Sequence, residues 1–246
     1  MRSPHPLFDS KLYLHRNPDV AKDGINPLIH FLLSGARERR DPHTLFCMEW
    51  YLENNPDIAG MDVNPLVHYL TIGGNEGRSP HPLFDGVWYL ATYPDICNDQ
   101  TNPLVDYVVS GAWGGRKPNR YFDSAWYLQQ HPELVIQHIN PLSHYIETGR
   151  GKGFDPSPDF DSTWYLQYYP DIAEANIDPF EHYIHQGMKE GRLSKPEPGG
   201  EPSFPASNQA NDEPVDVSAT DVQSDYVPET PAPEVPSPPP VRLIAF

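Results

Sequence analysis

The chain has 246 residues, with 17 lysines and arginines against 34 aspartates and glutamates, which gives a formal net charge of −17 at pH 7. Phosphate backbones and anionic lipid headgroups repel a charge of this sign within a Debye length of roughly 10 Å. Nucleic acid and bare membrane are therefore poor candidates for partners. The sequence has neither the ~20 consecutive apolar residues of a membrane span nor the apolar segment of a signal peptide. We expect a cytoplasmic protein that reaches the inner face of the membrane only through partners.

A 38-residue unit recurs five times without insertion or deletion. Its conserved spacing is carried by Phe8, Phe46, Phe84, Phe122 and Phe160, and by Tyr13, Tyr51, Tyr89, Tyr127 and Tyr165. Units one to five cover about residues 7–44, 45–82, 83–120, 121–158 and 159–194. A fixed period of this length is typical of stacked repeat proteins.

The first two helices of each unit are marked by an aspartate and a proline. In unit one, Asp9 fits an N-cap whose carboxylate accepts backbone N–H groups, and Phe8 with Tyr13 fits a hydrophobic staple. Pro18 cannot continue this helix but suits the first position of the next one. The pattern predicts two short helices with a bend between them.

A third helix is expected between Asn26 and Gly35. Asn26 fits an N-cap followed by Pro27, and Gly35 is expected to end the helix in a left-handed conformation. A turn should follow, with glycine in four of five copies at the position of Gly77. Helices this short are marginal alone. The sequence therefore predicts an all-α tandem array over residues 1–194, stabilised by packing of each unit on its nearest neighbours.

Both ends of the sequence indicate a longer parent protein. Residues 2–9 repeat residues 78–85 letter for letter, so the sequence begins in the closing turn of a unit. Residues 195–240 form a Pro/Glu/Ser-rich segment that is expected to be a disordered linker. Residues 241–246, VRLIAF, turn apolar, and we expect them to be the first strand of a further domain.

The segments LFDGVWYLATYPDI and NPLVHYLTIGGNEGRSPHPLFD resemble a repeat found with bacterial glycosyltransferases and other cell-surface polysaccharide proteins. The resemblance covers residues 1–192. The last six residues resemble the opening strand of the WbsX-like glycosyltransferase family. These resemblances imply a role in lipopolysaccharide or O-antigen assembly, with a catalytic glycosyltransferase domain downstream in the parent chain. They place no catalytic residue in this chain.

Histidines recur at one helical position, with Asp106 in unit three. A ladder of metal ligands is one interpretation, but the residues are one unit apart, and a metal site needs ligands within ~2–2.6 Å of one ion. We expect these imidazoles to form hydrogen bonds across the interface between units instead. They are His30, His68, His144 and His182.

Tryptophans recur in the first helix, with Leu12 in their place in unit one. Aromatic faces bind the C–H surfaces of sugars, so the tryptophans are candidate glycan-stacking residues. Large aromatic residues at recurring positions are also typical of a repeat core, and Leu12 agrees with that alternative. The residues are Trp50, Trp88, Trp126 and Trp164.

Arginines recur after the turn, with Phe154 in their place in unit four. They could bind an acidic partner through paired hydrogen bonds. Alternatively they pair inside the array with the recurring Asp19, Asp57, Asp95, Glu133 and Asp171. The arginines are Arg40, Arg78, Arg116 and Arg192.

The sequence contains no glycine-rich phosphate loop, GxSxG elbow or HExxH motif. We therefore expect no catalytic residue, cofactor or metal in this chain. The leading hypothesis is a non-catalytic repeat region of a glycosyltransferase-type protein that positions the enzyme, its glycan or a protein partner. The alternatives are a free-standing protein-interaction scaffold and a glycan-binding module.

Overall fold

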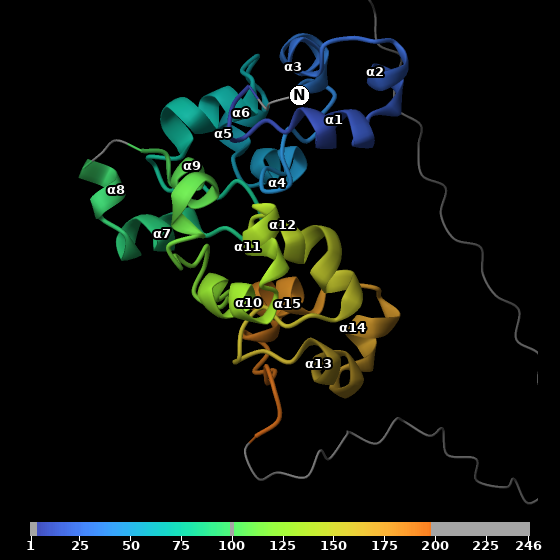
Figure 1. The fold of residues 1–246 in the computed structure, drawn as a ribbon, viewed down its shortest axis with the longest axis vertical. Helices are drawn as coiled ribbons and strands as arrows, with labels where there is room; N and C mark the ends of the chain where they lie inside the picture. Colours follow the sequence, from blue (N-terminus) through green and yellow to red (C-terminus); the bar gives the residue numbers. More distant parts are fainter. Residues whose placement is uncertain (1–3, 99–100, 198–246) are drawn as a thin grey trace, which may run out of the picture. The chain divides into compact units, whose positions relative to one another are not determined.

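The computed structural model describes residues 4–98 and 101–197. These residues form an all-α array of five repeated units, as the sequence predicts (Figure 1). The linker and strand expected over residues 195–240 and 241–246 lie outside the described residues, except for 195–197. Every helix in the described part of the chain is too short or too polar to cross a lipid bilayer.

Each unit contains three short α-helices, the third of which continues into a turn of π-helix. The first helices are α1 (Ser10–Arg16), α4 (Met48–Glu53), α7 (Gly86–Thr92), α10 (Ser124–Gln130) and α13 (Ser162–Tyr168). The second helices are α2 (Pro18–Lys22), α5 (Pro56–Ala59), α8 (Asp95–Asn98), α11 (Glu133–Gln137) and α14 (Pro170–Glu174).

The third helices are α3 (Pro27–His30), α6 (Pro65–His68), α9 (Pro103–Asp106), α12 (Pro141–His144) and α15 (Pro179–His182). They continue as the π-helical turns η1 (Phe31–Gly35), η2 (Tyr69–Gly73), η3 (Tyr107–Gly111), η4 (Tyr145–Gly149) and η6 (Tyr183–Gly187). The 3₁₀ turn η5 (Arg150–Lys152) follows η4.

The expected N-caps are present at both kinds of helix start. Asp9 Oδ1 accepts the backbone N–H groups of Lys11 and Leu12 at 2.9 and 3.1 Å. Asn26 Oδ1 accepts those of Leu28 and Ile29 in the same way. These bonds satisfy backbone donors that have no partner inside the helix.

Unit two is the exception among the first helices. Cys47 stands where the other units have an aspartate, and its side chain forms no cap bond. Asp41 Oδ1 instead accepts the backbone N–H of Met48 at 2.8 Å. The unit therefore keeps a carboxylate at the start of α4, supplied from the preceding turn.

Removing one of these caps should destabilise the array. Asp85 Oδ1 accepts the backbone N–H of Trp88 at 3.0 Å. We expect Asp85→Ala to lower the free energy of unfolding by about 0.5–2 kcal/mol. Urea denaturation followed by circular dichroism measures this change. A variant with wild-type stability would contradict the start of α7 at Gly86.

The glycine that ends the third helix is required by close packing. The backbone of Gly35 is not left-handed, so the expectation that this residue ends the helix in a left-handed conformation was wrong. A Cβ at Gly35 would lie within van der Waals overlap of the Tyr13 hydroxyl. The left-handed residue comes four positions after this glycine. It is Arg39 (φ 57°) in unit one and a glycine in the other units, such as Gly77 (φ 76°) in unit two. The repeat thus uses one glycine for space and another for backbone conformation.

The core of each unit is built from three aromatic rings. In unit one, Phe8, Tyr13 and Phe31 are fully buried, and their ring centroids lie 5.4–5.9 Å apart. The Phe8 and Tyr13 contact is the expected hydrophobic staple. Equivalent rings recur in the other units, and a continuous apolar cluster joins all five.

Neighbouring units also meet through polar contacts. Arg37 of unit one forms a 2.9 Å ion pair with Asp62 of unit two. Asn102 Nδ2 of unit three donates to the backbone carbonyl of Tyr69 in unit two at 3.1 Å. The predicted packing between neighbours is therefore present.

Contacts between units three places apart correct the expectation of nearest-neighbour packing alone. The Thr44 hydroxyl, at the end of unit one, donates a hydrogen bond to the Glu147 carboxylate of unit four. His185 Nε2 of unit five lies 3.1 Å from the carbonyl of Pro82, at the end of unit two. Both pairs are 103 residues apart. The array therefore winds so that η4 and η6 reach the turns that close units one and two.

Candidate functional site

The recurring arginines are all held by carboxylates of the same unit. Each arginine forms an ion pair with the aspartate near the start of the second helix. The N–O distances are 2.8 Å for Arg40–Asp19, 2.8 Å for Arg78–Asp57, 2.5 Å for Arg116–Asp95 and 2.8 Å for Arg192–Asp171. The bond from Arg40 lowers the pKa of Asp19 to about 2. In unit four the arginine position is Phe154, whose ring stacks on His131 at 4.5 Å. The arrangement ties the closing turn of each unit to its second helix.

The recurring histidines are each bonded to a buried tyrosine within the same unit. Tyr13 and His30 are joined by a 3.0 Å bond between the hydroxyl and Nδ1. In unit three, the Tyr89 hydroxyl donates to Asp106 at 2.6 Å. The expectation of bonds across the interface between units was therefore wrong, because the first and third helices of one unit already bring these groups together. Among the described residues, no group of three or more side chains is arranged to hold a metal ion.

The four recurring tryptophans have different environments. Trp164 is buried, with 8% of its surface exposed, and its ring stacks on Tyr168 at 4.6 Å. Trp126 is half-buried and packs against the apolar core. Trp50 and Trp88 are also half-buried, but both line one groove.

This groove, which we name the aromatic groove, has a volume of about 410 Å³ and lies where units two, three, four and five meet. Its walls combine aromatic rings with a carboxylate, a guanidinium and an imidazole. They include Trp50, Trp88, Tyr121, Asp85, Arg120 and His185.

Two rings of the aromatic groove, Trp50 and Tyr121, are held by contacts between units, whereas Trp88 packs against Tyr93 of its own unit. The Trp50 ring lies 5.1 Å from that of His185, and the Tyr121 ring lies 6.1 Å from that of Tyr183. His185 is further held at the carbonyl of Pro82. Burial lowers the pKa of His185, so its neutral form is favoured at pH 7. The groove thus offers aromatic ring faces beside polar groups.

Sequence reasoning identified two of these residues and missed the others. Trp50 and Trp88 were selected as candidate glycan-stacking residues because they recur. Tyr121 and His185 were missed because their equivalents in other units are different residues, such as Leu45 and Glu147. The aromatic residues at 121 and 183 form a pair that only the folded array reveals.

Comparison with protein-family models, with curated proteins and with solved structures finds no significant match. The fold and the groove define the chain as an α-helical repeat protein with an aromatic surface groove.

Proposed function

We propose that this chain is a non-catalytic helical repeat region of a glycosyltransferase-type protein of polysaccharide assembly, and that it holds glycan in the aromatic groove. The observation that carries the proposal is the meeting of Trp50 and Trp88, from successive units, in one groove. The repeat's resemblance to those found with bacterial polysaccharide proteins agrees with it.

The chemistry of the groove suits a saccharide. Indole and phenol rings present flat apolar faces to the C–H surface of a sugar, while the carboxylate of Asp85 and the guanidinium of Arg120 can bond its hydroxyl groups. A volume of about 410 Å³ is within the range of small-molecule sites. Pre-ordered rings reduce the entropy that binding costs.

The recurring polar side chains support a structural rather than a catalytic role for the repeat motif. Each unit uses its Tyr–His or Tyr–Asp bond and its Arg–Asp pair in the same way, apart from Phe154 in unit four. In the proposal, the array works on the cytoplasmic side. There it positions glycan for a catalytic domain of the parent protein.

Titration with bacterial oligosaccharides, followed by tryptophan fluorescence, tests the proposal. Loss of a stacking face costs about 1.4 kcal/mol, or tenfold in affinity. We therefore expect Trp88→Ala to weaken binding by about that factor. Trp126→Ala is the matched control, because Trp126 occupies the same position in the next unit but does not line the groove.

Two outcomes would count against glycan binding in this groove. One is the absence of any spectral change at millimolar sugar. The other is an equal loss of affinity in the two variants, which would place the sugar elsewhere or indicate a general loss of structure.

A further inference from the structure

A second hollow, of about 310 Å³, lies beside the aromatic groove, and we name it the adjoining hollow. It shares Arg120 and Tyr121 with the aromatic groove. Its wall also contains Tyr183, whose ring lies 6.1 Å from that of Tyr121. A ligand in either space therefore meets Arg120 and Tyr121. Other residues of this wall are Lys117, Asp123, Asp159 and Phe180.

Both shared residues depart from the repeat. The position of Arg120 is otherwise occupied by threonine or proline, as Pro6, Thr44, Pro82, Pro158 and Pro196. The position of Tyr121 is otherwise occupied by leucine or an acidic residue, as Leu7, Leu45, Leu83, Asp159 and Glu197. The turn that closes a unit therefore forms without a guanidinium at this position. Since the side chain of Arg120 is also exposed, the fold does not account for it.

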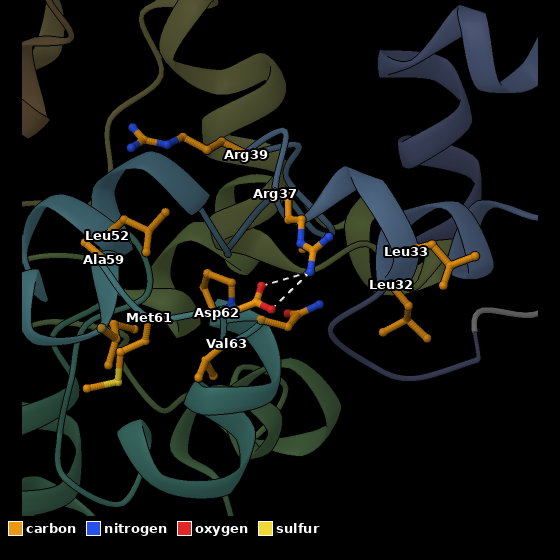
Figure 2. A pocket seen from close by; sticks show the side chains of 13 residues that line it. Leu32, Leu33, Arg37, Arg39, Leu52, Ala59, Met61, Asp62 and Val63 are labelled. Carbon is orange, nitrogen blue, oxygen red and sulfur yellow. Dashed lines mark hydrogen bonds and ion pairs between the residues drawn. The ribbon is translucent and has the colours of Figure 1, made fainter. Parts of the chain in front are cut away.

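Arg120 differs from most arginines of the array because it has no carboxylate partner among the described residues. Ion pairs are formed by Arg16, Arg37, Arg39, Arg40, Arg78, Arg116 and Arg192. Exposure is not the reason for the difference. Figure 2 shows Arg37 paired with Asp62, although 74% of the Arg37 side chain is exposed. Arg150 is the other described arginine without such a partner, and it lines neither of the two spaces.

The carboxylates in the two walls are already bonded within the protein. The bonds join Asp85 to the backbone N–H of Trp88 at 3.0 Å, Asp123 to Lys117 at 2.8 Å and Asp159 to Lys195 at 2.8 Å. Among the charged side chains of these walls, Arg120 is therefore the one whose donors have no partner in the described part of the chain. Its guanidinium offers five N–H donors to a ligand.

We propose that the glycan held in the aromatic groove is acidic, and that Arg120 binds the carboxylate of one of its sugars. The inference rests on the proposed function, because it names the class of glycan. A guanidinium matches a carboxylate through two parallel hydrogen bonds. A uronic acid carries a single negative charge, whereas a phosphate ester carries about −1.5 to −2. The uronic acid fits better, because three carboxylates stand in the same walls.

The net charge of the chain does not prevent this contact. A charge of −17 repels anions at long range, but at 0.15 M salt this repulsion is screened over about 8 Å. Arg120 acts at hydrogen-bond distance, where screening is weak. A nucleic acid presents a closely spaced row of phosphates and needs several cations to bind it. One unpaired guanidinium therefore favours a ligand with isolated carboxylates over a nucleic acid.

Titration of the full chain at 0.15 M salt, followed by tryptophan fluorescence, tests the inference. The ligands are glucuronic-acid-containing hexasaccharides from bacterial capsular polysaccharides. Each is compared with its carboxyl-reduced form, which has the same length and linkages but a hydroxymethyl group in place of the carboxylate. The wild-type chain should bind the acidic form about tenfold more tightly, because hydrogen bonds between charged groups are the stronger kind.

Two variants locate this preference. Arg120→Gln should remove it by weakening the binding of the acidic form alone. Arg150→Gln is the matched control, because it also removes an arginine without a carboxylate partner, but one that lines neither space. It should keep the tenfold difference between the acidic and reduced forms.

The outcomes separate this inference from the proposed function. Equal affinity of the wild-type chain for both forms, with both weakened by Trp88→Ala, would overturn the inference and leave glycan binding in the groove intact. A preference for the acidic form that survives Arg120→Gln, in a variant with the wild-type circular dichroism spectrum, would also overturn it. Failure of every hexasaccharide to bind in either form would count against the proposed function as well.

Discussion

Gly111→Ala should lower the free energy of unfolding by about 3 kcal/mol. A Cβ at this position would lie 2.5 Å from the Tyr89 hydroxyl and 2.8 Å from Asp106 Oδ2. These two groups are bonded to each other at 2.6 Å, and the Tyr89 ring is fully buried. Overpacking of this kind costs about 1–3 kcal/mol, and the disrupted hydrogen bond adds about 1 kcal/mol. Urea denaturation followed by circular dichroism measures the loss.

Gly151→Ala is the control for that substitution. Gly151 lies in η5, its φ is not positive, and a Cβ there would contact nothing within 4 Å. Its replacement should leave stability unchanged or raise it slightly, because alanine restricts the unfolded chain. Equal stability of the two variants would mean that the Tyr89 hydroxyl does not occupy the space beside Gly111.

Local features of the fold could be predicted because they depend on neighbouring residues in the sequence. The cap at Asp9, the staple between Phe8 and Tyr13, and the start of α2 at Pro18 each involve groups within five residues of one another. Because the 38-residue period is strict, the helix order predicted for one unit applied to all five.

The role of Gly35 could not be predicted in this way. A glycine at the end of a helical pattern usually adopts a left-handed conformation. Here the chain passes through a π-helical turn first, and the left-handed residue comes at Arg39 and its glycine equivalents. The constraint on Gly35 comes from Tyr13, 22 residues earlier, so no local pattern contains it.

The aromatic groove could be predicted from the sequence only in part. Repetition indicated Trp50 and Trp88, but the groove also needs His185 from unit five. That contact depends on the small rotation between successive units, which accumulates until η6 meets the turn at Pro82. The recurring motif is compatible with many rotations, so the three-unit contact could not be derived from it.

Acidification from pH 7 to pH 5 should destabilise the array through His43 and His81. Each imidazole sits in the turn before a unit, and its Nδ1 accepts the backbone N–H of the residue two positions on, at 3.0 Å. Nδ1 can accept this bond only while it carries no proton. Burial lowers the pKa of His43 to about 4 and, with a smaller effect of Arg150, that of His81 to about 3.

The sign follows from proton binding in the two states. Between the folded pKa and the ordinary value of 6.5, the unfolded histidine binds a proton and the folded one does not. Each neutral histidine therefore makes its full contribution to the free energy of unfolding above pH 6.5, and this contribution is lost as the pH falls toward the pKa of the folded state. At pH 5 the loss is about 2 kcal/mol for each histidine, or about 4 kcal/mol for the pair. Urea denaturation at a series of pH values measures it.

The repeat itself supplies the substitution that isolates this effect. Asn119 occupies the position of His81 in the next closing turn, and its Oδ1 accepts the backbone N–H of Tyr121 at 2.8 Å. His81→Asn should therefore keep the turn and remove one titrating group. A carboxyl group whose pKa is raised by burial, such as Asp41, stabilises the folded state as the pH falls. Such groups are present in both the variant and the wild type, so their effect cancels in the difference. The stability difference between variant and wild type should thus shift by about 2 kcal/mol in favour of the variant between pH 7 and pH 5. A pH-independent difference would mean that the folded turn does not lower the pKa of His81 and that its Nδ1 is not the acceptor.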